Sequence, residues 1–225
     1  MKVFSIDTLD YLREVREQNS REWFADNKDW YTEALITPLQ NFVQYLSETM
    51  SNIDEEFELM PRVNKTISRI NRDTRFSKDK SLYKDKMWVT FKKRGKDKID
   101  YPAYFFELGP QSYRYGMGFF SASPKSMGLL RELMTEKEKH FSQLVKAVEE
   151  KKIFNVEGEM YKRNQFADKK PELQQWYNRK NIYLAYNSEI VDELFQDDFM
   201  ENVKEDYIFL AGMYHFFVEA MSKGN

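Results

Sequence analysis

The chain has 225 residues, 16% of them aromatic, and it contains no cysteine. This length exceeds the common domain size of about 100–150 residues, but the aromatic side chains can fill a large core, so we expect one globular domain over residues 1–225. The lack of cysteine excludes disulfides, thiolate metal ligands and a cysteine nucleophile, and it fits a reducing compartment. The net charge of −2 argues against a general polyanion-binding protein.

Two segments could in principle direct the chain to a membrane, and neither has the apolar length that this requires. The first residues reach an acid at Asp7 and lack the apolar core of a secretory signal. The longest nearly continuous apolar run covers residues 207–218, and it is shorter than the ~20 residues that a bilayer requires. We therefore expect a cytoplasmic protein without a membrane partner.

Helical periodicity dominates the N-terminal part of the chain. Apolar residues at intervals of three and four predict a helix over residues 5–18. Asn19 and Glu22 have the three-residue offset of a capping box, which predicts a helix start at Asn19. A longer apolar repeat predicts a helix that ends near Met50, and Pro38 within it should kink or split that helix.

The middle of the chain is typical of β-strands. Alternating or β-branched residues predict strands over residues 63–70, 87–91, 102–108, 112–120 and 182–186. The sequence GPQS between the third and fourth of these segments predicts a hairpin turn. Gly116 and Gly118 lie inside a predicted strand, where glycine indicates a bulge or the close approach of another backbone or ligand.

Helical patterns return after Pro124. Apolar spacing predicts a helix over residues 126–148 with a break within 135–140, a short helix over residues 171–177 and a long C-terminal helix around residues 203–221. The whole pattern predicts an α+β fold, with a mostly antiparallel sheet of about five strands packed with the N-terminal and C-terminal helices.

Most motifs that carry enzyme chemistry are absent from this sequence. The two histidines, His140 and His215, have no partner at metal-ligand spacing, so we expect no metal site. No phosphate-binding loop occurs, and Gly116-x-Gly118 lacks the later glycine of a dinucleotide fingerprint. We therefore predict no cofactor, and whether the protein is an enzyme stays open.

One stretch differs from the rest of the chain by its charge. Residues 62–98 carry 14 Lys and Arg against four Asp, a local charge of +10, whereas the remainder carries −12. Salt screens charges beyond about 8 Å, so a small anion responds to the local balance. The centre of this stretch contains the candidate ligand-binding residues Arg69, Arg72, Arg75, Lys78, Lys80 and Lys84.

The side chains of this stretch favour recognition of an anion. The three-residue spacing of the arginines would align them on one helical turn or let them converge from a loop. Guanidinium groups suit phosphate and carboxylate, and lysines add charge. A small anionic ligand is the favoured partner, and nucleic acid, which could stack on nearby aromatic residues, is the less favoured one.

Two other interpretations stay open. An enzyme acting on a phosphorylated substrate at this stretch would need a nucleophile or base, for which the local candidates are Asp73, Ser77, Asp79 and Tyr83. Alternatively, the interspersed aspartates pair with the neighbouring cations, and the stretch is a salt-bridged turn with a structural or interaction role.

Two motifs resemble one protein family. NSREWFADNKDWY, residues 19–31, followed by SRINRDTRFSKDKSLYK, residues 68–84, is similar to the bacterial and fungal family catalogued as domain of unknown function 2461. The similarity continues through Gly116-x-Gly118 and GEMYKRNQF, residues 158–166, and so covers most of the chain. Leu82 departs from the family pattern, which has proline there.

The resemblance has limited implications for function. It implies a mixed α+β domain in a bacterial cytoplasm, and it implies no reaction, cofactor or catalytic residue. It also suggests that Trp23, Phe24 and the basic stretch pack together as one feature.

Overall fold

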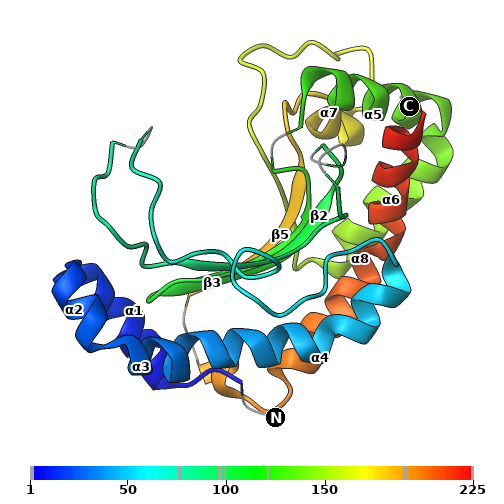
Figure 1. Cartoon of the computed structure of the whole chain (residues 1–225). Coiled ribbons are helices and arrows are strands. Elements are labelled where there is room, and N and C mark those ends of the chain that lie inside the picture. Colours follow the sequence, from blue (N-terminus) through cyan, green and yellow to red (C-terminus); the bar gives the residue numbers. More distant parts are fainter. Residues whose placement is uncertain are drawn as a thin grey trace. The chain divides into compact units, whose positions relative to one another are not determined.

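The computed structural model describes residues 3–75, 78–95, 98, 100–120, 122–189 and 192–223 (Figure 1). Contacts divide the chain into two compact units. Unit 1 consists of Met1–Phe91, Phe105–Arg114 and Asn187–Asp206, and unit 2 consists of Lys92–Tyr104, Tyr115–Tyr186 and Tyr207–Asn225. The expectation of a single domain over residues 1–225 stays a prediction.

The described residues form one antiparallel sheet of five strands, in the order β1-β2-β3-β5-β4. The strands are β1 (Met87–Phe91), β2 (Ala103–Leu108), β3 (Ser112–Gly118), β4 (Asn155–Glu157) and β5 (Tyr183–Glu189). Together with the helices described below, this sheet confirms the predicted α+β fold.

Local sequence signals predict some features of this sheet correctly and miss others. The hairpin at GPQS is confirmed, since the Gly109 amide donates to the Ser112 carbonyl at 2.9 Å between β2 and β3. The predicted strand over residues 63–70 is wrong, because that segment makes only isolated bridges such as Ile67↔Val89. Strand β4 is not predicted; it has three residues and pairs with β5.

The glycines of β3 let β5 approach closely, as their position in the sequence predicts. A Cβ atom at Gly116 would lie 1.8 Å from the Leu184 carbonyl oxygen, and one at Gly118 would lie 2.3 Å from the Tyr183 Cα. Both contacts are with the backbone, which cannot move aside without breaking the pairing of β3 and β5. These two glycines are therefore a requirement of the sheet.

Consecutive helical elements form the N-terminal part of unit 1: α1 (Ile6–Gln18), α2 (Arg21–Asp26), α3 (Lys28–Trp30), a π-helical turn (Tyr31–Ile36) and α4 (Thr37–Ile53). The helical residues continue without a gap from residue 28 to residue 53, so Pro38 changes the helix type and does not split the helix. Pro38 has no amide hydrogen for the carbonyl of residue 34, and its ring crowds that carbonyl. The preceding turn widens instead, and the Thr37 amide donates to the Thr32 carbonyl.

The junction between α1 and α2 corrects the predicted capping. Asn19 is the C-cap of α1, in the left-handed conformation (φ 30°, ψ 37°), and not the start of the next helix. Ser20 is the N-cap of α2, and its side chain accepts from the Trp23 amide at 3.1 Å. The reversal at Asn19 turns its side chain away from α2, which matters for the site below.

An aromatic cluster joins α4 to the sheet inside unit 1. The rings of Phe42 on α4 and Phe106 on β2 lie with centroids 4.5 Å apart, and Phe4 stacks on Phe106 at 5.4 Å. All three side chains are buried. This core holds β2, and with it the neighbouring β1, against the N-terminal helices.

The remaining helices are α5 (Pro124–Glu136), α6 (Glu138–Lys151) and α7 (Pro171–Tyr177) in unit 2, and α8 (Phe199–Ser222), which begins in unit 1 and continues into unit 2. The predicted break within residues 135–140 is confirmed at Lys137, which separates α5 from α6. Within the described part of the chain, no helix is both long enough and apolar enough to cross a membrane.

Candidate functional site

The basic stretch forms an irregular antiparallel arm next to β1, seen in teal near α2 in Figure 1. Two bonds of 2.8 Å pair its two sides, from the Arg72 amide to the Leu82 carbonyl and from the Lys84 amide to the Ile70 carbonyl. We call residues 69–84 the basic arm. Its arginines therefore lie on an extended, irregular segment and not on a helical turn.

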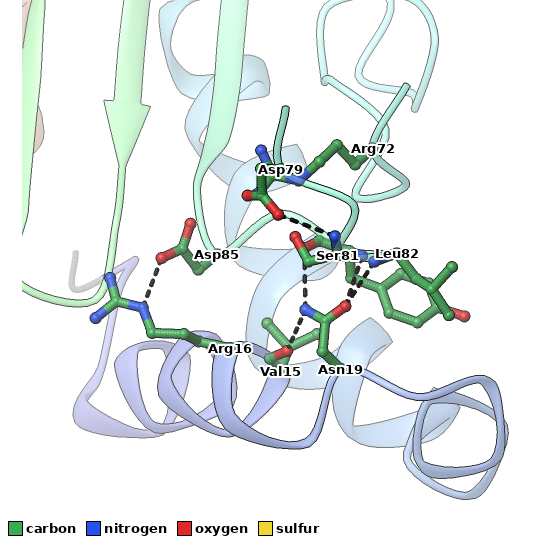
Figure 2. Close-up of polar contacts among 9 residues, drawn as sticks. Val15, Arg16, Asn19, Arg72, Asp79, Ser81, Leu82 and Asp85 are labelled. Carbon is green, nitrogen blue, oxygen red and sulfur yellow. Dashed lines mark hydrogen bonds and ion pairs between the residues drawn. The ribbon is translucent and has the colours of Figure 1, made fainter. Parts of the chain in front are cut away.

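Asn19 clamps the basic arm to the end of α1 (Figure 2). Its Oδ1 accepts from the amides of Leu82 and Tyr83 at 2.7 and 3.1 Å. Its Nδ2 donates to the carbonyls of Val15 and Tyr83 at 2.9 and 3.1 Å. One side chain thus satisfies backbone groups of α1 and of the arm, although 63 residues separate Asn19 from Leu82 in the sequence.

Ring stacking joins the basic arm to α2 as well. Phe24 stacks on Tyr83 with centroids 4.5 Å apart and an interplanar angle of 15°. Trp23 contacts Tyr11 and Trp30 and so packs within the N-terminal helices. The proximity that the family resemblance suggests is confirmed for Phe24, whereas Trp23 has no ring contact with the arm among the described residues.

At the tip of the arm, residues 73–75 and 78–80, acceptor groups of the arm itself hold Arg75 and Lys80. Arg75 donates to Asp73 from Nε at 3.0 Å and from Nη2 at 2.7 Å, a forked pair that holds the pKa of Asp73 at about 2. Lys80 donates to the Thr74 carbonyl at 2.7 Å. These interactions agree with the salt-bridged interpretation for this part of the arm, and Ser77 lies outside the described residues.

Asp79 holds another arginine of the arm, Arg72. It forms an ion pair with Arg72 at 3.1 Å and accepts from the Ser81 amide at 2.9 Å. The hydrogen bonds from Ser81, and then the charge of Arg72, lower the pKa of Asp79. The Lys78 side chain is exposed.

Three cations converge where the arm meets β1, namely Arg69, Arg72 and Lys84, which we call the arm-base cluster. The Lys84 ammonium lies 5.1 Å from the centroid of the Trp88 ring on β1. Burial lowers the pKa of Lys84, and the positive charges of Arg72 and Arg69 lower it further. Arg72 and Arg69 are therefore each close enough to Lys84 to disfavour its positive charge.

The arm-base cluster has little compensating negative charge. Among the described residues, no hydrogen bond or ion pair engages the Arg69 guanidinium, although its charge also contributes to the low pKa of Asp73. Arg72 is paired with Asp79, and its buried Nε has no hydrogen-bond partner within the described part of the chain. Among the described residues, Arg72 is thus the one cation of this cluster that forms an ion pair with a carboxylate.

The two charged residues that follow Lys84 in the sequence bind partners outside the cluster. Asp85 accepts from Arg16 of α1 at 2.6 Å (Figure 2). Lys86 donates to Glu107 of β2 at 2.9 Å, and the same carboxylate accepts from the Trp88 indole at 2.9 Å. Glu107 is buried, and sequence reasoning missed its role because it lies 21 residues from Lys86.

The local candidates for catalysis are occupied by structural contacts. Asp73 and Asp79 hold arginines and are ionised, so they are weak bases with no proton to donate near neutral pH. The Tyr83 ring is buried against Phe24. In the described residues, no group of three or more His, Cys, Asp or Glu could hold a metal ion. The arrangement is suited to attracting an anion.

Fold and site together define an α+β protein with a basic arm that an asparagine clamps to the N-terminal helices. The family model described as a conserved hypothetical protein (DUF2461) matches residues 7–216, so the chain belongs to this family. The resemblance seen in the sequence is thereby confirmed. A comparison with curated proteins found no match.

Proposed function

We propose that this protein binds a small ligand carrying phosphate or carboxylate at the arm-base cluster, Arg69, Arg72 and Lys84. The observation that supports it is the convergence of three cations with a single ion-paired carboxylate. Keeping like charges together in a folded protein is unfavourable unless an opposite charge compensates them. A bound anion would supply that charge, and the fork of an arginine would fix its orientation.

The proposal narrows the six candidate residues to three. Arg75 and Lys80 are used within the tip of the arm, where Asp73 and the Thr74 carbonyl hold them. The cluster is small and most of the chain outside residues 62–98 is acidic, which favours a compact anion over an extended nucleic acid. We also propose a cytoplasmic location, which suits a chain without cysteine.

Two triple variants with the same change of charge test this proposal. Arg69→Gln/Arg72→Gln/Lys84→Gln removes the arm-base cluster, and Arg75→Gln/Lys78→Gln/Lys80→Gln removes three cations of the tip. Phosphate binding is measured by calorimetry at constant ionic strength, with circular dichroism as the control for folding. The arm-base variant is expected to lose at least about tenfold in affinity, since bonds to charged groups contribute ~1.5–3 kcal/mol each.

The tip variant is expected to stay within about threefold of the wild type, a difference below ~0.7 kcal/mol. Equal losses in both variants would show that only overall charge matters and would contradict the assignment of the site. A wild-type protein that does not bind phosphate or a simple carboxylate would remove the proposal. If the protein binds nucleic acid with a steep salt dependence, and both triple variants weaken that binding, nucleic acid becomes the favoured partner.

A further inference from the structure

A polar hollow lies wholly within unit 2, away from the basic arm in the sequence. It has a volume of about 540 Å³, and its lining includes Phe120, Glu157, Glu159, Arg179, Lys180 and Tyr183. It adjoins β4 and the start of GEMYKRNQF, a motif that the basic arm does not use. The volume is within the usual range of small-molecule sites, roughly 300–1,000 Å³.

Arg179 is the buried charge of this hollow. Its side chain is only 9% exposed. Nη1 donates to the Gly158 carbonyl at 2.8 Å and Nη2 donates to the Val156 carbonyl at 2.6 Å. Nε is buried and has no hydrogen-bond partner among the described residues, and no carboxylate there forms an ion pair with the guanidinium.

These contacts fix the guanidinium and leave its charge without an ion pair. A guanidinium has five N–H donors, and the two carbonyls, which are neutral, engage only two of them. Burial lowers the pKa of Arg179, whereas the charge of Glu157 opposes that effect. A buried charge without an ion pair is unfavourable by several kcal/mol as an order of magnitude, and a ligand anion would compensate it.

Another part of the lining is aromatic. Phe120 and Tyr183 are nearly parallel, with an interplanar angle of 12° and centroids 6.2 Å apart. The Phe120 side chain is 44% exposed, which is unusual for so large an apolar group. A flat apolar group of a ligand would cover this ring and remove it from water.

The acids of the lining limit the charge of the ligand. Glu159 forms an ion pair with Lys180, and Glu157 lines the same hollow. Their two negative charges balance those of Arg179 and Lys180, so a dianion would be repelled more strongly than a monoanion. A carboxylate matches the planar donors of a guanidinium better than a rounded monovalent ion does.

We propose that this hollow binds a small monocarboxylate with a flat apolar body, with the carboxylate at Arg179 and the apolar body on Phe120 and Tyr183. This site does not depend on the arm-base cluster. Its ligand class is narrower, because the arm-base cluster has excess positive charge and suits phosphate as well as carboxylate, whereas the charges of this lining are balanced.

Benzoate and its neutral isostere benzamide test the proposal in an NMR titration of the isotope-labelled full chain. Benzoate is expected to shift resonances of residues 156–159 and 179–183 in a saturable manner, and benzamide is not. Phe120→Ala changes an exposed side chain and is expected to weaken benzoate binding by about three- to tenfold. Arg179→Lys keeps the charge but loses the fork, and it is expected to weaken binding at least about tenfold.

Several results would overturn this assignment. They are the lack of saturable benzoate binding, equal binding of benzamide, and unchanged affinity in Phe120→Ala. If Arg179→Lys does not fold, Phe120→Ala and the benzamide comparison decide the question. The Arg69→Gln/Arg72→Gln/Lys84→Gln variant is expected to bind benzoate at this hollow like the wild type, which separates the outcome from that of the arm-base cluster.

Discussion

Replacing Gly116 by alanine is expected to lower the free energy of unfolding by about 3 kcal/mol or more, at the upper end of the cost of overpacking. The new methyl group would lie 1.8 Å from the Leu184 carbonyl oxygen, a separation that no side-chain rotation can relieve. Strand β5 would have to move away from β3, and hydrogen bonds between the two strands would be lost. Urea denaturation of the purified variant measures the change.

Gly128→Ala is the matched control for this substitution. Gly128 lies in α5, and a Cβ atom there would meet no atom within 4 Å. Alanine is the better helix former, so the variant is expected to gain about 0.5–1 kcal/mol. Similar stabilities for the two variants would contradict the close approach of β5 to Gly116.

Asn19→Ala is expected to lower the free energy of unfolding by about 5–6 kcal/mol, because four side-chain hydrogen bonds are lost and alanine disfavours the left-handed backbone. The left-handed backbone of Asn19 costs alanine ~1–2 kcal/mol, and each lost bond to the backbone adds about 1 kcal/mol. The loss is also expected to be local, because the amides of Leu82 and Tyr83 lose their common acceptor. Denaturation measures the total, and amide hydrogen exchange locates it.

Two controls separate the clamp from ordinary effects at a helix end. Asn27→Ala removes one side-chain bond, from Nδ2 to the nearby Trp23 carbonyl at 2.8 Å, and is expected to cost only about 1 kcal/mol. Asn19→Gly keeps the left-handed backbone and isolates the contribution of the side-chain bonds. If exchange at Leu82 and Tyr83 in Asn19→Ala is as slow as in the wild type, the clamp is not what holds the arm.

The parts of the fold that the sequence predicts are those with strong local signals. Strand β1 alternates buried and half-buried residues over its whole length, and Pro38 changes the helix type within its own neighbourhood. Strand β4 has three residues, none of them fully buried, so it carries no periodic signal. Residues 63–70 have β-branched residues, but they contact β1 through one isolated bridge, Ile67↔Val89, and a few hydrogen bonds, without forming a strand.

The site shows the same division between local and distant information. The positive charge of residues 62–98 is visible in the sequence, but which cations are already paired depends on partners far along the chain. Lys86 is held by Glu107, and Asp85 is held by Arg16. Asn19 and Glu22 have the spacing of a capping box, and the neighbouring Ser20 is also a residue type preferred at the N-cap. Nothing local indicates that Asn19 binds the arm.

The pKa of Lys84 tests the central claim most directly, because it reports the crowding of positive charge in the arm-base cluster. Burial, Arg72 and Arg69 disfavour the protonated ammonium, so its pKa is expected below the ordinary value of about 10.4. A bound anion stabilises the ammonium, so phosphate should raise this pKa. By linkage, phosphate affinity should then fall as the pH rises through the pKa of Lys84.

The measurement is an NMR titration of the Lys84 side chain with pH, with phosphate and with chloride at equal ionic strength. We predict a lowered pKa in chloride, a higher pKa in phosphate, and a rise in chloride when Arg69→Gln and Arg72→Gln remove the neighbouring charges. A Lys84 pKa at the ordinary value in chloride, unchanged by phosphate and by both substitutions, would contradict an anion site at the arm-base cluster.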